Sequence, residues 1–198
     1  GSGIPYRFAS YTHKDFDITV GNYYEQFGGG LLLRTYVERS LDIDNSLDGI
    51  RLRYKPFNGV YLKGVIGQQR FYFDKGEGIV RGLDGEINLN ELNKKWTTAQ
   101  FRTIIGASFV SKYQADRDPL YKLPENVGGW SLRTNMTYSN FMLNAEYAYK
   151  VNDPSASNYF IYKPGEALVT SLSYSEKGFG ITLSAKRIDN MNFRSDRA

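Results

Sequence analysis

Apolar and polar residues alternate along much of this 198-residue chain. From Trp130 to Tyr138, every second residue is apolar or threonine, and polar residues such as Arg133 stand between them. Successive side chains of a β-strand point to opposite faces, so a period of two predicts strands with one apolar and one polar face. Similar runs predict about eleven antiparallel strands in a single domain, 1–198. The predicted strands are 4–14, 16–27, 31–39, 49–56, 60–73, 78–89, 98–113, 129–138, 141–151, 167–174 and 179–189.

Helical structure is expected only as a turn within 91–97. Short connections at 57–59, 139–140 and 175–178 predict three hairpins, because a tight loop fixes the register of the strands that it joins. The cross-strand partners that follow are Tyr54 with Leu62, Met136 with Leu143, Arg133 with Glu146, and Leu172 with Ile181. The glycines at 28–30 predict a tight turn or a close approach of backbone, because no phosphate-loop lysine follows them.

Two connections are long and polar, 114–128 and 152–166. Long loops on a rigid scaffold often carry binding residues. We therefore expect partner binding to involve their aromatic residues, namely Tyr121, Tyr159, Phe160 and Tyr162. Alternatively, each loop could fold inward as a plug or form a disordered tip.

The composition limits which metal sites, disulfides and nucleic-acid contacts the chain can form. The chain has no cysteine and one histidine, which excludes disulfides and argues against zinc or other multi-histidine metal centres. The net charge of +4 comes from interspersed charges, which does not favour nucleic-acid binding. Asp42, Asp44 and Asp48 resemble a calcium loop, but Gly49 comes two positions late and Arg53 replaces the expected glutamate. We predict no metal and no cofactor.

Aromatic residues cluster at the ends of the late strands, with smaller or aliphatic residues such as Leu132 between them. Aromatic belts on either side of an apolar band are typical of strands that cross a bilayer. The pattern favours a partial up-and-down transmembrane β-barrel in contact with membrane lipid. The alternate residues would line its lumen; they include Arg51, Arg53, Lys55, Arg133, Glu146 and Lys150. This lumen could pass or bind a small solute, or its opposite charges could simply neutralise one another.

Several segments resemble an uncharacterised outer-membrane β-barrel family of Bacteroidota, the domain of unknown function 6029. They are GIPYR (3–7), VGNYYEQFG (20–28), LRTY (33–36), DGIR (48–51), LKGVIG (62–67) and RIDNMNFRS (187–195). The resemblance implies a bacterial outer-membrane location and carries no defined activity. It covers nearly the whole chain as an internal part of a longer protein. The odd strand number agrees, since single-chain bacterial barrels usually close with an even number.

The leading hypothesis is a non-enzymatic outer-membrane barrel. It would act as a channel, or as a structural or partner-binding component of an envelope complex. A link of this complex to secretion rests on analogy alone. The first alternative is a soluble all-β module that binds a ligand or a glycan. The second is an envelope hydrolase that uses His13 with Ser10 and Asp15. Ser10 and His13 have opposite parity on one predicted strand, which argues against that pair.

Overall fold

A computed structural model describes residues 6–41, 43–71 and 74–192. In these residues, long strands form one sheet and two short strands form another. The strands are β1 (Phe8–His13), β2 (Phe16–Tyr23), β3 (Val37–Glu38), β4 (Ile43–Asp44), β5 (Leu47–Phe57), β6 (Val60–Phe71), β7 (Asp74–Asn88), β8 (Phe101–Tyr113), β9 (Asn126–Tyr138), β10 (Phe141–Lys150), β11 (Gly165–Glu176) and β12 (Phe179–Asp189). The helical turns are α1 (Leu89–Leu92), η1 (Arg39–Leu41), η2 (Lys94–Trp96) and η3 (Ala156–Asn158). The helical turn predicted within 91–97 is confirmed by α1 and η2.

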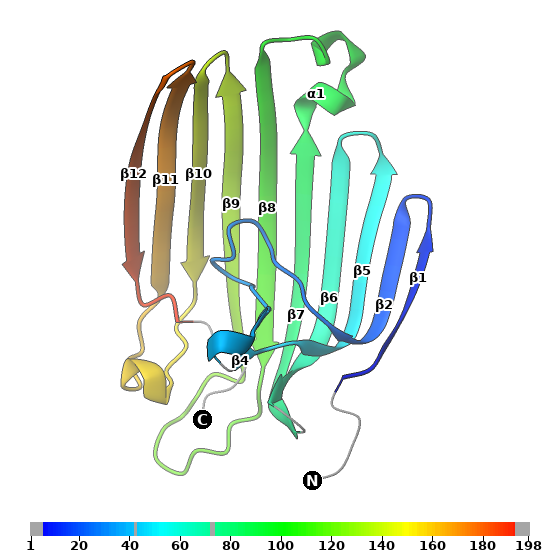
Figure 1. Cartoon of the computed structure of the whole chain (residues 1–198). Coiled ribbons are helices and arrows are strands. Elements are labelled where there is room, and N and C mark those ends of the chain that lie inside the picture. Colours follow the sequence, from blue (N-terminus) through cyan, green and yellow to red (C-terminus); the bar gives the residue numbers. More distant parts are fainter. Residues whose placement is uncertain (1–5, 42, 72–73, 193–198) are drawn as a thin grey trace.

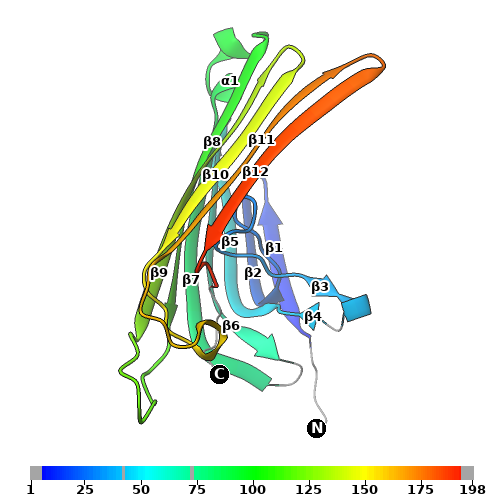
Figure 2. The same cartoon turned by 90° about the vertical axis from the view of Figure 1, so that its left-hand side faces the viewer.

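The main sheet is an antiparallel meander of ten strands in the order β1-β2-β5-β6-β7-β8-β9-β10-β11-β12. It curves into a trough, and the segment between β2 and β5 lies on its inner side (Figure 1 and Figure 2). The all-β, up-and-down prediction is confirmed. In the described ranges β1 and β12 are edge strands, so this sheet is open and not a closed barrel.

Two of the three predicted hairpins have the predicted register. Tyr54 lies opposite Leu62, and Arg133 lies opposite Glu146. Both turns are tight, and each one brings the apolar residues of its two strands to the same face. A slip by one residue would move every side chain to the other face, so the alternating pattern and the turn specify the same pairing.

The third hairpin differs from the prediction by two residues. Leu172 lies opposite Leu183 and not opposite Ile181. Both strands continue beyond the predicted ends, so that the turn contains only Lys177 and Gly178. Gly178 has a φ of 84°, which a glycine adopts without strain. A shift of two residues keeps every side chain on its predicted face.

The predicted strand over 31–39 is wrong, and only its residues 37–38 are a strand, the short β3. The rest belongs to the connection between β2 and β5, which we call the inner loop (residues 24–46). Leu32 and Leu33 are buried there. A run of adjacent leucines has no period of two, and here Leu32 and Leu33 are buried because their part of the loop folds onto the sheet, whereas Val37 and Leu41 remain exposed.

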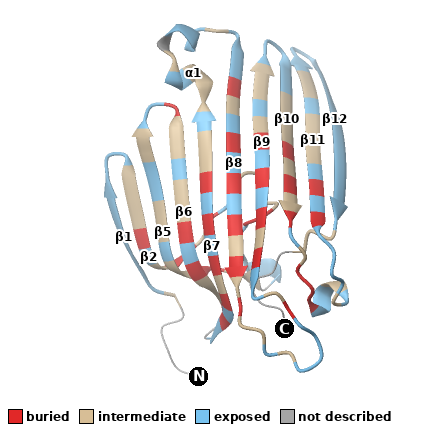
Figure 3. Ribbon diagram, turned by 180° about the vertical axis from the view of Figure 1, so that it is seen from behind, coloured by how far each residue is buried: buried red, intermediate tan, exposed pale blue. Residues whose placement is uncertain are grey.

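The two faces of the sheet have opposite chemistry, and their exposure is inverted relative to a water-soluble sheet. On the outer face, Leu132 is 55% exposed and Ile181 is 52% exposed. On the inner face, Arg133 is 7% exposed and Glu146 is 8% exposed. Buried and exposed residues alternate along the central strands (Figure 3). The apolar core lies between the inner loop and the inner face; it includes Tyr23, Phe27, Leu32, Leu33, Leu47, Val65, Val80, Val110, Ala148 and Ala167.

The long connections gather at one end of the sheet (Figure 1). The inner loop begins and ends there, and so do 114–125 and 151–164, which confirms the two long loops predicted from the sequence. Tight turns lie at the other end, together with the connection that carries α1. In the described ranges, no helix is long and apolar enough to cross a bilayer.

Candidate binding pocket on the inner face

The inner loop touches the sheet where the sheet has glycines. A Cβ on Gly82 would lie 2.7 Å from the ring of Phe27, and a Cβ on Gly129 would lie 2.9 Å from Leu32. The loop is also glycine-rich at its contact: a Cβ on Gly29 would lie 2.6 Å from Glu146. At each contact a glycine of one segment leaves room for a side chain of the other. The tight turn predicted for the glycines at 28–30 is confirmed, since the Gly30 N–H donates to the Phe27 carbonyl oxygen at 2.8 Å.

Ion pairs also hold the inner loop. The carboxylate of Glu25 accepts a hydrogen bond from Arg53 at 2.7 Å and lies 3.4 Å from the Lys63 ammonium. Asp44 pairs with Arg70. Burial alone would raise the pKa of Glu25, but the hydrogen bond from Arg53 and the charge of Lys63 outweigh it, so this pKa lies below its ordinary value of 4.5.

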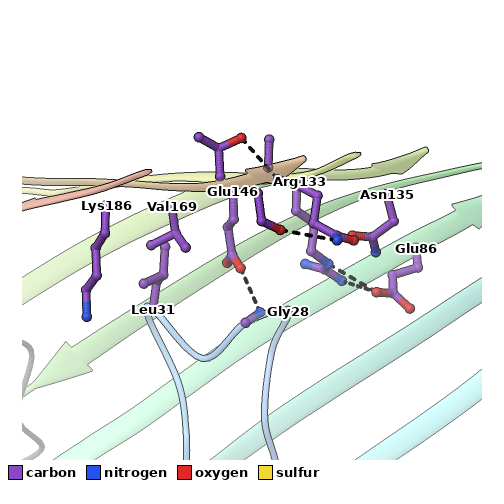
Figure 4. Close-up of a pocket in the computed structure, with 13 residues that line it drawn as sticks. Gly28, Leu31, Glu86, Arg133, Asn135, Glu146, Val169 and Lys186 are labelled. Atoms are coloured by element: carbon purple, nitrogen blue, oxygen red, sulfur yellow. Dashed lines mark hydrogen bonds and ion pairs between the residues drawn. The ribbon is translucent and has the colours of Figure 1, made fainter. Parts of the chain in front are cut away.

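Four inner-face residues form a row across neighbouring strands. Arg133 on β9 lies opposite Glu146 on β10, Glu146 lies opposite Val169 on β11, and Val169 lies opposite Lys186 on β12. Their side chains project to the same side, toward the inner loop (Figure 4). A second row, two residues closer to the tight turns, contains Asn135, Asn144, Ser171 and Ser184.

Arg133 does not form the ion pair with Glu146 that its register predicts. Its guanidinium lies 2.8 Å from Asp84 and 2.9 Å from Glu86, both on β7. It reaches them by crossing Gly106 on β8, where a Cβ would lie 2.5 Å from the guanidinium. The register of Arg133 and Glu146 is as predicted, but the two side chains form no ion pair. The glycine on the intervening strand instead leaves space for the Arg133 side chain to reach the two carboxylates on β7.

Glu146 is instead bound by backbone. Its Oε2 accepts a hydrogen bond of 2.7 Å from the Gly29 N–H. Its Oε1 is buried and has no hydrogen-bond partner. Beside it lies a pocket of about 520 Å³ whose lining includes Leu31, Val169, Lys186 and the amides of Asn135 and Asn144 (Figure 4).

The other residues expected to line a lumen also lie on the inner face. Arg51 donates hydrogen bonds to Asp17 at 3.0 Å and to Thr19 at 2.9 Å. The Lys55 ammonium lies 5.2 Å from the centroid of the Tyr61 ring. Arg51 is thus paired with an acid of β2, and Lys55 lies against an aromatic ring.

Lys150 lies at the long-loop end of β10 and is fully buried. Its ammonium donates to the carbonyl oxygen of Asn192 at 2.9 Å. Nearby, Lys112 and Asp153 form a buried ion pair of 2.8 Å. These contacts attach Asn192, which follows β12, and Asp153 of the 151–164 connection to the sheet, which is a structural role.

The aromatic residues of the two long loops come together. Tyr121 stacks on Phe160 with 4.4 Å between ring centroids, and the Tyr162 hydroxyl donates to the carbonyl oxygen of Lys122 at 2.6 Å. Tyr159 is 89% exposed and has a φ of 56°, a strained backbone for a residue with a side chain. The sequence pattern predicted both loops but not their contact with each other.

The structure does not bring Ser10 and His13 together. The Ser10 hydroxyl shares a hydrogen bond of 2.9 Å with Thr19, and the His13 ring stacks on Tyr11. Of the aspartates in the calcium-like segment, Asp44 pairs with Arg70, and Asp48 pairs with Lys75 at 2.7 Å. Asp42 lies outside the described residues. Among the described residues, including Asp44 and Asp48, no group of three or more metal-ligating side chains is found.

Sequence reasoning missed Asp84, Glu86 and Glu25, the acids that neutralise the inner-face cations. Each belongs to an alternating or polar segment, but no local signal links it to its partner.

A search of curated proteins finds no match. A family model described as a family of unknown function, DUF6029, matches residues 1–198. The chain therefore belongs to the DUF6029 family.

Proposed function

We propose that the protein is a non-enzymatic outer-membrane β-barrel component whose outer face contacts lipid and whose inner face is filled by its own loop. The observation that carries this proposal is the inverted burial of the two faces. In water, exposing a continuous apolar face is unfavourable, and burying charges beneath a loop costs desolvation. In a bilayer, the same arrangement is favourable, because a charge on the lipid face costs about 2–4 kcal/mol at mid-depth.

The aromatic residues of the outer face support this orientation. At the tight-turn end, Phe141 lies 4.9 Å from Tyr174, measured between ring centroids. At the other end, Trp130 lies 5.6 Å from Tyr147. Trp130 and Tyr138 bound a segment of nine residues in β9, and about 9–11 residues are needed for a tilted strand to cross a bilayer.

A barrel also requires that the edge strands be paired. Hydrocarbon offers no hydrogen bonds to backbone, so an open edge is costly within a bilayer. In the proposal, the outward edges of β1 and β12 are therefore completed by further strands, which close the trough around the inner loop.

The inner loop favours a structural or partner-binding role over an open channel. It covers the middle of the inner face and is held by Glu25, Asp44 and the apolar core. The long loops with the stacked Tyr121 and Phe160 then form the surface available to an envelope partner.

Tryptophan fluorescence tests the lipid contact. The chain has two tryptophans, so Trp96→Phe leaves Trp130, which is 40% exposed on the outer face, as the single reporter. In vesicles of dibrominated phosphatidylcholine, we expect strong quenching of Trp130. The matched control is Trp130→Phe, which leaves Trp96 beside α1, where we expect weaker quenching. A protein that stays monodisperse without detergent and shows no quenching would instead be the soluble module.

Conductance tests the role of the inner loop. In planar bilayers, we expect the intact protein to conduct little, and a variant lacking residues 27–35 to conduct strongly. If the intact protein already conducts, and Arg53→Glu changes its ion preference, the channel function replaces the structural one.

A further inference from the structure

Two charged side chains of the inner-face row have no counter-ion among the described residues. Glu146 forms no ion pair, and its buried Oε1 accepts no hydrogen bond. Lys186 on β12 lines the same pocket, and no described side chain neutralises it. The remaining cation of the row, Arg133, is occupied by Asp84 and Glu86.

The two groups lie too far apart to neutralise each other. Glu146 and Lys186 are both in register with Val169, so they are separated by two strand spacings, which is about 10 Å between backbones. Figure 4 shows both side chains pointing to the same side of the sheet, with Val169 between them and Leu31 of the inner loop nearby. A negative group, a short apolar surface and a positive group thus stand in line.

An unsatisfied buried carboxylate oxygen needs an explanation, because it has lost its hydrogen bonds to water and no protein hydrogen bond replaces them. Gly28 shields Oε1; a Cβ on Gly28 would lie 2.9 Å from it. A small outward shift of Gly28 would open Oε1 to the pocket while the Gly29 N–H still holds Oε2. The pocket of about 520 Å³ is within the usual range for small-molecule sites.

We propose that this pocket binds a small zwitterion, a free amino acid or a short peptide. Its ammonium group donates to Oε1 of Glu146, its carboxylate pairs with Lys186, and its backbone lies over Val169. Amides and hydroxyls from the second row, such as Asn144 and Ser171, bind its remaining polar atoms. A simple cation would leave Lys186 unpaired, and a simple anion would leave Glu146 unpaired, so one molecule with both charges fits best.

The test is calorimetric titration of the full chain with glycylglycine, in the buffer or detergent that keeps the protein monodisperse. We expect saturable binding at one site. N-acetylglycylglycine lacks the ammonium and glycylglycine amide lacks the carboxylate, so each should bind at least tenfold more weakly. Glu146→Gln and Lys186→Met should each weaken glycylglycine binding at least tenfold. The side-chain amide in Glu146→Gln still offers an oxygen acceptor to the Gly29 N–H, and circular dichroism checks that both variants fold.

The matched control is Lys177→Met, which removes a lysine from the β11–β12 turn, eight or more residues along the strands from the inner-face row, and should bind as the wild type does. Absence of glycylglycine binding to the wild type overturns the proposal. Blocked dipeptides that bind as tightly as glycylglycine, or pocket variants that bind glycylglycine as tightly as the wild type, overturn it as well. The pocket does not depend on lipid contact: a protein that is soluble without detergent and binds glycylglycine retains this inference and loses the membrane proposal.

Discussion

Arg133 and Glu146 lie directly opposite each other on neighbouring strands, yet each binds a different part of the molecule. Arg133 reaches across β8 to Asp84 and Glu86, whereas Glu146 binds the inner loop through the Gly29 N–H. The pair thus connects two structures, the wall of the sheet and the loop within it. This division leaves the carboxylate of Glu146 only half satisfied.

The crossing over Gly106 predicts a specific overpacking effect. Gly106→Ala should destabilise the protein by about 1–3 kcal/mol, because the new methyl group would displace the Arg133 guanidinium from its carboxylates. Urea unfolding followed by circular dichroism measures this. Gly64→Ala is the control, since its Cβ would lie 3.6 Å from Leu83, an ordinary contact. Equal stability of the two variants would contradict the prediction.

The orientation of the faces predicts opposite responses to arginine on β9. Leu132→Arg places a charge on the outer face and should cost about 2–4 kcal/mol of folding free energy in a bilayer. Asn135→Arg places the same charge on the inner face, beside the pocket, and should cost much less. Folding yield into lipid vesicles, followed by gel mobility with and without heating, compares them. A soluble protein would show no such difference.

Glu25 predicts loss of stability in acid. Because its pKa is lower in the folded protein than the ordinary value of 4.5, its charged form stabilises the fold. This contribution is complete above the ordinary pKa and is lost as the pH falls through the lowered one, which places the change at pH values below about 4.5. Glu25→Gln should be less stable at pH 7 and should lose less stability over that interval. The thermal-unfolding midpoint of each protein is measured as a function of pH. If the two midpoints fall by the same amount as the pH is lowered, Glu25 has no such role.

The buried ring of Phe27 should hold the inner loop against the sheet. This ring is 1% exposed and packs on Gly82; truncating such a ring typically costs about 3–5 kcal/mol. Phe27→Ala should therefore release the loop and speed trypsin cleavage after Arg34 or Arg39 by at least tenfold, as measured by mass spectrometry. Leu41→Ala is the control, because Leu41 is 67% exposed. Similar cleavage rates for both variants would argue against docking through Phe27.

The strands and their faces could be predicted from the sequence because both depend on a local pattern. Alternation between Trp130 and Tyr138 identifies β9 and its outer face without any knowledge of neighbours. Turn length then determines which residues pair, as for Arg133 and Glu146. The hairpin near Gly178 was misplaced because Ser175 and Glu176 look like turn residues but extend the strand.

The candidate pocket could not be predicted, because it depends on contacts between distant segments. The inner loop meets Glu146 across more than a hundred residues of sequence, and the three leucines at 31–33 look like a buried strand. Which carboxylate pairs with Arg133 depends on the space above Gly106, a property of the neighbouring strand. The register does show that Glu146 and Lys186 share a face, but their lack of partners becomes visible only in three dimensions.

The opposite chemistry of the two faces has a consequence for insertions and deletions. One residue added directly after Trp130 would reverse the facing of every later residue in β9, so that Arg133 would point outward and Leu132 inward. Added residues in 114–125 would only lengthen an exposed connection. Length variation within this family should therefore be confined to the connections, and changes within strands should come in steps of two.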